Sequence, residues 1–225
     1  MLLLFNIMSI HSQLELQRSR LQDSDNDIKA LISTIFGEIE SVTKRPGEPE
    51  KSFVRYDDLK VIWSDRWRIS CLLQLDYTHE DQIDFIQENM IIIISTLISI
   101  GADDWLTNFR ARLFDSVSGH AIVTDDGIPF EMDRLTFLDS SLALQRAFYE
   151  YQFRFKPVVI EQRPQVIENK MLRLPFEYCD DIGSGGFGKV DRVGISPKCI
   201  KEESGSTWES VRTHFNWVIS KIILL

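Results

Sequence analysis

The sequence predicts an α+β protein in which a mainly helical region is followed by a short β-hairpin. Over most of residues 1–160, apolar side chains recur every three or four positions, which is the main sequence signal of amphipathic helices. From residue 183 three glycines lie close together, and short apolar segments on both sides of them are typical of strands. We therefore expect a helical N-terminal domain over residues 1–160, a linker over residues 161–171 and a β-containing region over residues 172–225.

Composition narrows the classes of partner and the compartment. The chain has 225 residues, 44% of them hydrophobic, and a formal net charge of −9. It can therefore bury a core, and neither nucleic acid nor an anionic membrane is expected as a partner because both repel an acidic protein. The three cysteines are widely spaced, which favours reduced thiols in a cytoplasmic or nuclear compartment over disulfides or a zinc site. The four histidines show no metal-ligand spacing, so no metal site is expected.

Two apolar stretches are not interpreted as targeting or membrane segments. Residues 1–10 lack the basic start and the small-residue cleavage site of a signal peptide, so the protein is not expected to be secreted. Residues 90–100 form the most apolar run of the chain. That run is much shorter than the roughly 20 residues of a transmembrane helix, and a buried helix is the better interpretation.

The helical region begins with a clearly periodic segment. From Asp25, which with Asp27 is a candidate N-cap, apolar residues follow helical spacing; they are Ile28, Leu31, Ile32, Ile35, Phe36, Ile39 and Val42. Further helices are predicted over residues 57–75, from Thr78 to a terminal glycine at Gly101, and over residues 103–114 and 135–153. An extended segment is expected to follow up to residue 160. Trp63, Trp67 and Trp105 are expected to be core aromatics of the resulting bundle.

The strongest functional signal is a glycine-rich stretch with the pattern G-x-G-x-x-G-x-V. Gly183, Gly185 and Gly188 supply a backbone that can turn sharply and approach a ligand closely, because no Cβ is in the way. Free backbone N–H groups in such a turn can face phosphate oxygens. The stretch therefore predicts a nucleotide-binding loop. Its candidate residues are Ile182, Gly183, Ser184, Gly185, Gly186, Phe187, Gly188, Lys189 and Val190.

Other interpretations of this stretch can be compared with the residues that follow it. A P-loop needs Ser or Thr after its lysine to hold Mg²⁺, and Val190 stands there instead. A dinucleotide-binding fingerprint must lead directly into a helix, whereas the residues after Gly188 predict a short strand that is stopped by Pro197. A glycine-rich hairpin turn without a ligand has the same local pattern, and that alternative stays open.

The stretch resembles the protein-kinase glycine-rich loop, a strand–turn–strand lid over the phosphates of ATP. Arg173, Leu174, Pro175 and Phe176, followed by the stretch from Ile182 to Val190, are similar to the start of the kinase domain in fungal serine/threonine protein kinases. A looser likeness to the region before that domain covers residues 148–160. The resemblance implies a mainly α N-terminal domain followed by a β-hairpin that corresponds to the first strands of a kinase N-lobe.

The same resemblance implies ATP as the cofactor and a protein as the substrate of the complete form. Backbone N–H groups of residues 184–188 would approach the β- and γ-phosphates. Ile182 and Val190 would enclose the adenine, and Phe187 at the tip would shield the transfer site from water. Mg²⁺ is implied together with ATP, but the chain has no identifiable ligands for it.

The other parts of a working kinase are not found after the loop. No V-A-x-K or H-R-D motif occurs, and these motifs supply the phosphate-binding lysine and the catalytic base. Lys201 is the nearest stand-in for the lysine, although a solvated lysine beside Glu202 is the better interpretation. Asp126 and Gly127 lack the phenylalanine of a D-F-G motif.

We therefore assign no catalytic residue and expect a kinase fragment, cut within the N-lobe, that is inactive by itself. The alternative is a non-catalytic helical interaction module that binds a protein partner and carries a remnant kinase loop.

Overall fold

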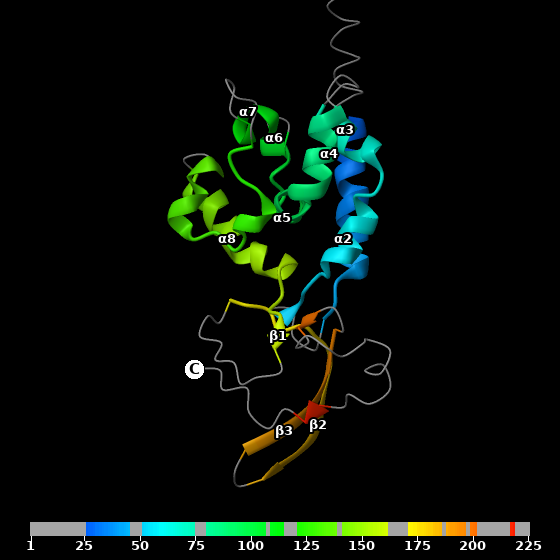
Figure 1. Ribbon diagram of the computed structural model, residues 1–225, viewed down its shortest axis with the longest axis vertical. Coiled ribbons are helices and arrows are strands. Elements are labelled where there is room, and N and C mark those ends of the chain that lie inside the picture. The colour runs from blue at the N-terminus through cyan, green and yellow to red at the C-terminus, as the bar shows by residue number, and fades with distance from the viewer. Residues whose placement is uncertain are drawn as a thin grey trace, which may run out of the picture.

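A computed structural model of the chain describes residues 26–45, 51–74, 80–106, 109–114, 121–138, 141–161, 171–185, 188–196, 199–201 and 217–218. Most of these residues are helical, and a small antiparallel sheet follows the helices, which confirms the α+β class. Figure 1 shows the helices gathered in one body, with strands β2 and β3 projecting from one end of it.

The elements follow one another in a simple order. Residues 26–42 are helical. The α-helices after them are α2 (Tyr56–Ile62), α3 (Arg66–Leu72), α4 (Glu80–Asn89), α5 (Ile91–Ser99), α6 (Asp103–Leu106), α7 (Phe109–Leu113) and α8 (Leu142–Phe155). Two 3₁₀ helices, η3 (Asp125–Gly127) and η4 (Met132–Leu138), precede α8. The strands are β1 (Ile160–Glu161), β2 (Phe176–Gly185), β3 (Gly188–Ile195), β4 (Ile200–Lys201) and β5 (Trp217–Val218).

Helix α5 is the centre of the fold. Every residue from Ile91 to Ile98 is buried, and helices α2, α4, α6 and α8 all contact it. A helix that is apolar on every side must be enclosed in this way, so the predicted buried helix is confirmed. Two of its polar side chains form hydrogen bonds within the core: Ser95 accepts a hydrogen bond from Trp63 Nε1 at 2.9 Å, and Thr96 donates to the Ile92 carbonyl at 2.8 Å. None of the helices in the described part of the chain is both long enough and apolar enough to span a membrane.

The helix over residues 26–42 packs its predicted apolar face on this core. Ile32, Ile35 and Ile39 are buried, whereas Phe36 is at the edge of the face and partly exposed. Two arginines from helices distant in sequence form hydrogen bonds with glutamates on the polar side of the helix over residues 26–42. Arg68 of α3 donates hydrogen bonds to both carboxylate oxygens of Glu38, and Arg154 of α8 donates one to Glu40 at 2.6 Å.

The prediction of one helix over residues 57–75 is wrong in one respect, because the structure has two helices, α2 and α3, in this range. Helix α2 ends before Ser64, and Asp65 starts α3 by accepting a hydrogen bond from the Trp67 backbone N–H at 3.0 Å. The restart changes which face of the helix points inward. Trp67 is therefore 57% exposed and is not a core residue, whereas Trp63 and Trp105 are buried as predicted.

The long helix predicted from Thr78 is also divided, into α4 and α5. The break is at Met90, whose φ of −139° is not helical. Its cause lies about 30 residues further along the chain: Asp125 of η3 accepts hydrogen bonds from the backbone N–H groups of Ile92 and Ile93, at 2.9 and 3.0 Å. This carboxyl group satisfies the N-terminus of α5 as an N-cap would. Thr78, the predicted cap, lies outside the described residues.

Two further helices differ from prediction at their boundaries. Within the predicted helix over residues 103–114, the described parts are α6 and α7, and Phe114 instead forms a β-bridge with Ala121. The predicted helix over residues 135–153 begins late. Residues up to Leu138 belong to the 3₁₀ helix η4, and α8 starts after Ser141, which accepts from the Leu144 N–H. Helix α8 ends at Phe155 and leads into the extended segment expected before residue 160.

Backbone pairing joins the end of the helical region to the strands that follow. Strands β1 and β4 pair in parallel, with Ile160 opposite Ile200. The Val158 N–H also donates to the Arg173 carbonyl at 2.8 Å. Strands β2 and β3 form an antiparallel hairpin, and β5 pairs with β3. Most of the linker predicted over residues 161–171 lies outside the described residues.

A matched pair of glycine substitutions tests the end of α5. The backbone N–H groups of Gly101 and Ala102 bond back to the carbonyls of Ile98 and Leu97, and Gly101 has a φ of +68°, which together form a Schellman cap with Gly101 at C′ as predicted. Gly101→Ala is expected to lower the free energy of unfolding by about 1 kcal/mol, because this backbone conformation is strained for an L residue. Chemical denaturation measures the change.

Gly37→Ala in the helix over residues 26–42 is the control for this pair. At both positions an added Cβ would meet no atom within 4 Å, so only the backbone conformation differs. Gly37→Ala should raise the free energy of unfolding by up to about 1 kcal/mol, because alanine favours a helix interior over glycine. Equal effects of the two substitutions would contradict the assigned cap.

Candidate functional site

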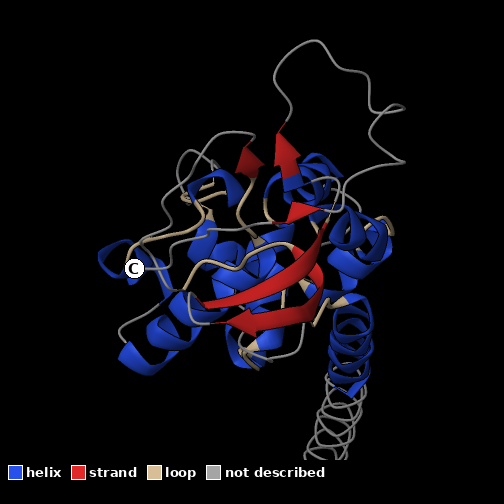
Figure 2. Cartoon of the chain, turned by 90° about the horizontal axis from the view of Figure 1, so that it is seen from below, coloured by secondary structure: helices blue, strands red, loops and turns tan. Residues whose placement is uncertain are grey.

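The glycine-rich stretch lies in two antiparallel strands, β2 and β3, that pair with each other. Gly183 pairs with Val190 across the hairpin, and Gly185 pairs with Gly188 at its end. Gly186 and Phe187 lie outside the described residues, as do the side chains of Ile182, Ser184, Lys189 and Val190, so the described geometry is that of the backbone. Seen from below, β2 and β3 run side by side in front of the helices (Figure 2).

This backbone decides between the interpretations of the stretch. A dinucleotide-binding fingerprint and a P-loop both need a helix after the last glycine, but β3 begins at Gly188. Both alternatives are therefore excluded. A kinase-type lid and a hairpin turn without a ligand share the observed backbone, so the described register does not separate them.

Two glycines of the hairpin stand in contrasting surroundings. At Gly194 an added Cβ would lie 2.1 Å from the ring of Tyr178, so a larger residue would fit only if the Tyr178 side chain moved. At Gly183 an added Cβ would meet no atom within 4 Å, and the φ angle is not in the left-handed region. Gly183 is exposed and follows an irregularity of register between Asp181 and Gly183. Neither sterics nor φ explains a glycine at this position.

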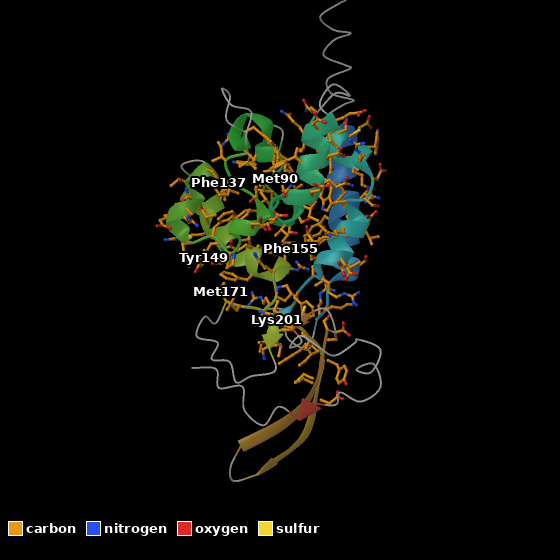
Figure 3. The ribbon with its side chains drawn as sticks, viewed as in Figure 1. Met90, Phe137, Tyr149, Phe155, Met171 and Lys201 are labelled. Carbon is orange, nitrogen blue, oxygen red and sulfur yellow. The ribbon has the colours of Figure 1, made fainter. Side chains whose placement is uncertain are left out.

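The structure does not place Lys201, Asp126 and Gly127, the other residues compared with kinase motifs, together with the glycine-rich hairpin. Lys201 is exposed and lies on β4, opposite Glu161 of β1 and not on the sheet of the hairpin. Figure 3 shows Lys201 where the helical body meets the strands. Asp126 and Gly127 are part of η3, among the helices. In the described part of the chain, no three His, Cys, Asp or Glu side chains are grouped closely enough to hold a metal ion.

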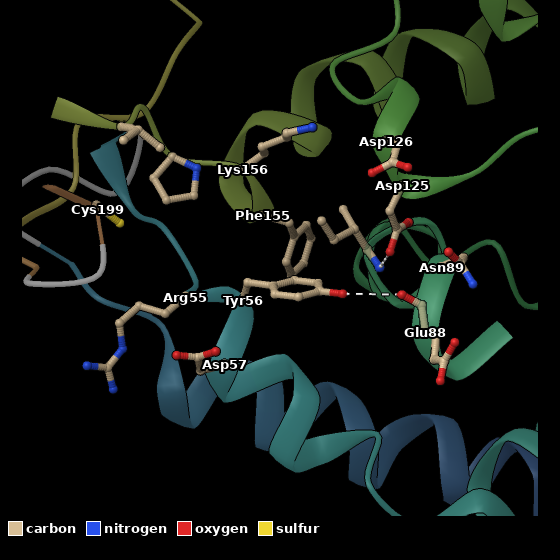
Figure 4. Close-up of a pocket in the computed structure, with 13 residues that line it drawn as sticks. Arg55, Tyr56, Asp57, Glu88, Asn89, Asp125, Asp126, Phe155, Lys156 and Cys199 are labelled. Carbon is tan, nitrogen blue, oxygen red and sulfur yellow. Dashed lines mark hydrogen bonds between the residues drawn. The ribbon is translucent and has the colours of Figure 1, made fainter. Parts of the chain in front are cut away.

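A cavity of about 560 Å³ lies on the helical side of the molecule. Its lining comes from five separate segments: Arg55, Tyr56 and Asp57; Glu88, Asn89 and Ile92; Asp125 and Asp126; Phe155, Lys156, Pro157 and Val159; and Cys199. Figure 4 shows the rings of Tyr56 and Phe155 in the middle of the cavity, between an end with Arg55, Asp57 and Cys199 and an end with Glu88, Asp125 and Asp126. No lining residue comes from β2 or β3.

The acidic end of this cavity contains a carboxyl group with a strongly altered pKa. Asp125 is 8% exposed. Burial raises its pKa to about 7, although the N–H groups of Ile92 and Ile93 and the charge of Lys156 act in the opposite direction. Burial also raises the pKa of the Tyr56 hydroxyl, and the nearby charges of Asp125, Asp126 and Glu88 add to this effect. The Tyr56 hydroxyl donates a long hydrogen bond of 3.4 Å to the Glu88 carbonyl.

The opposite end of the cavity is lined by Arg55, whose guanidinium group already has carboxylate partners. The guanidinium of Arg55 donates two hydrogen bonds to Asp58, at 2.7 and 2.9 Å, and lies 3.7 Å from Glu177 of β2. These carboxylates, Asp58 first, raise the pKa of Arg55. The Cys199 thiol beside it has its pKa raised by burial. Sequence reasoning missed this cavity because its residues share no local motif.

Comparison with known proteins identifies no relative of this chain. No protein family matches the chain, and no curated protein or solved structure matches it significantly.

Proposed function

We propose that residues 172–201 carry the glycine-rich loop of an ATP-binding serine/threonine protein kinase, and that phosphoryl transfer to protein belongs to the complete form of that kinase. The observation that carries the proposal is Gly183, an exposed strand glycine that neither its φ angle nor a neighbouring atom requires. Glycine weakens a strand, and it often marks a bulge or a place where a ligand or another backbone approaches closely. The antiparallel pairing of β2 and β3 is compatible with a kinase-type lid.

In this proposal the chain positions the nucleotide. The N–H groups of residues 184–188 face the β- and γ-phosphates of ATP, and Ile182 and Val190 enclose the adenine. Phe187 at the tip keeps water from the transferred group. Positioning and charge stabilisation are the main sources of catalysis in phosphoryl transfer. The lysine, base and metal ligands belong to the complete form, so binding without turnover is expected of this chain.

Nucleotide binding to the full chain tests the proposal. An ATP analogue with a fluorescent label on its ribose is titrated in the presence of Mg²⁺, and unlabelled ATP should displace it. Gly183→Ala is expected to weaken binding by about tenfold, because a methyl group on the strand keeps the ligand away from the backbone. The added methyl meets no protein atom within 4 Å, so the fold should be retained.

Gly37→Ala is the matched control for this titration. It adds the same methyl group to another glycine without neighbours, on a helix rather than on the hairpin. Its affinity for the analogue should equal that of the wild type. Absence of binding to the wild type, or equal affinities for Gly183→Ala and wild type, would reject a nucleotide-binding hairpin.

A second candidate is a helical module that binds a protein partner. The observation that favours it is the core: among the described residues, all members of the main hydrophobic cluster lie between Ile32 and Phe155. The helical region therefore has a core of its own, to which none of the described hairpin side chains contributes. Sequencing the transcript across the codon for Leu225 separates the two candidates. A continuation with V-A-x-K, H-R-D and D-F-G motifs favours the kinase, and a genuine stop codon favours the module.

A further inference from the structure

The cavity between α2, η3 and the end of α8 has the size and lining of a small-ligand site. Its volume of about 560 Å³ falls within the range of roughly 300–1,000 Å³ that is usual for such pockets. Figure 4 shows the rings of Tyr56 and Phe155 side by side in the cavity, and its lining also includes the apolar residues Ile92, Pro157 and Val159. The kinase-type hairpin does not line it, so this cavity is independent of the proposed nucleotide site.

The charges around the cavity favour a cation. Glu88 and Asp126 are both exposed at one end, and among the described residues neither forms an ion pair. The two basic side chains of the lining are already engaged. Arg55 is held by Asp58 and lies near Glu177, and Lys156 donates to the Ile128 carbonyl. Lys156 keeps its positive charge, which acts on Asp125, but the two exposed carboxylates Glu88 and Asp126 outnumber it, so a nucleotide phosphate is disfavoured at this end.

The same residues indicate an organic cation and not a metal ion. No three His, Cys, Asp or Glu side chains in the described part of the chain are placed to ligate a metal. An alkylammonium or guanidinium group needs fewer direct ligands, because it combines charge-assisted hydrogen bonds to carboxylates with contact to aromatic rings. Its apolar stem requires the apolar wall that Tyr56 and Phe155 provide.

We propose that this cavity binds an alkylammonium or guanidinium group on an apolar stem. The charged group lies between Glu88 and Asp126, next to Asp125, and the stem lies against Tyr56 and Phe155. The same chemistry can come from a free amine or from a lysine or arginine side chain of a partner protein.

Two probes of equal size test the role of charge. Pentan-1-amine and its neutral counterpart pentan-1-ol are titrated into the full chain, and binding is followed by calorimetry and by the NMR signals of the Tyr56 ring. The amine is expected to bind about tenfold more tightly than the alcohol or better. The double variant Glu88→Gln/Asp126→Asn should lose about tenfold in affinity for the amine and keep its affinity for the alcohol.

The double variant Glu131→Gln/Asp133→Asn is the control. It removes the same two charges at exposed positions outside the cavity, and it should bind the amine as the wild type does. Equal affinity of the wild type for amine and alcohol, no binding of either, or equal losses in both double variants would overturn the proposal. Displacement of the amine by ATP would do the same, because it would identify the cavity as the nucleotide site.

A further arm of the experiment distinguishes the source of the cation. A blocked tripeptide with a central lysine is compared with pentan-1-amine and with the same peptide acetylated on the lysine side chain. If the lysine peptide binds more tightly than the amine and the acetylated peptide does not bind, a partner protein supplies the cation. If the free amine binds more tightly than the peptide, the ligand is a small molecule, and either result supports the cation site.

Discussion

Raising the pH from about 5 to about 8 is expected to destabilise the wild-type protein by about 2.5 kcal/mol relative to the variant Asp125→Asn. The cause is the carboxyl group that caps α5. Its pKa is about 7 in the folded protein, and its ordinary value is 3.8. Asparagine keeps an oxygen that accepts from the backbone of α5 but cannot ionise, so it serves as the reference. Urea denaturation of both proteins across this pH range measures the difference.

The direction of the effect follows from proton linkage. The folded state binds this proton more tightly than the unfolded state, so the contribution to stability is complete below about pH 4 and disappears as the pH rises through about 7. Lys156 acts against the shift and Asp126 adds to it, whereas burial is its largest cause. Tyr56 and Glu88 also face this end of the cavity. Their ionisation is common to both proteins, so the comparison isolates Asp125.

The neighbouring substitution Asp126→Asn is the control for charge. Asp126 belongs to the same 3₁₀ helix but is exposed, so its replacement should change the free energy of unfolding by less than about 0.5 kcal/mol. A constant difference between the wild type and Asp125→Asn from about pH 5 to about pH 8 would show that Asp125 does not titrate in this range.

Gln152→Leu is expected to lower the free energy of unfolding by about 2–4 kcal/mol. Gln152 is completely buried, and both ends of its amide are used. The Phe130 N–H donates to Oε1 at 2.7 Å, and Nε2 donates to the carbonyls of Phe130 at 2.8 Å and Tyr149 at 3.2 Å. Leucine fills a similar volume, so the expected loss comes from two buried backbone groups of Phe130 left without partners. Thermal and chemical denaturation measure it.

Glu150→Leu provides a comparison in the same helix. Glu150 is exposed on α8, so leucine at this position should change stability by less than about 0.5 kcal/mol. If Gln152→Leu proved equally mild, the segment at Phe130 would have to find other hydrogen-bond partners. The clamp between Gln152 and Phe130 would then not stabilise the fold.

The sequence was sufficient where the determining signals are local. The periodic residues around Ile35, the buried run of α5 and its terminal Gly101 each depend on neighbours within about two helical turns, and all three were predicted correctly. The hairpin at Gly183–Val190 follows from the glycine spacing and the strand that comes after it. Its nucleotide-binding role stays a prediction, because the described backbone suits a lid over ATP and a ligand-free turn equally.

Only the tertiary structure decided the features that depend on distant residues. The break at Met90 exists because Asp125 caps α5 from more than 30 residues away. No sequence pattern within α4 and α5 predicts this break. The same applies to the clamp of Gln152 on Phe130 and to the cavity, whose lining comes from five segments. Periodicity reports which face of a helix is apolar. It does not report which carboxyl group will meet which helix end, because that contact forms only when the whole core closes.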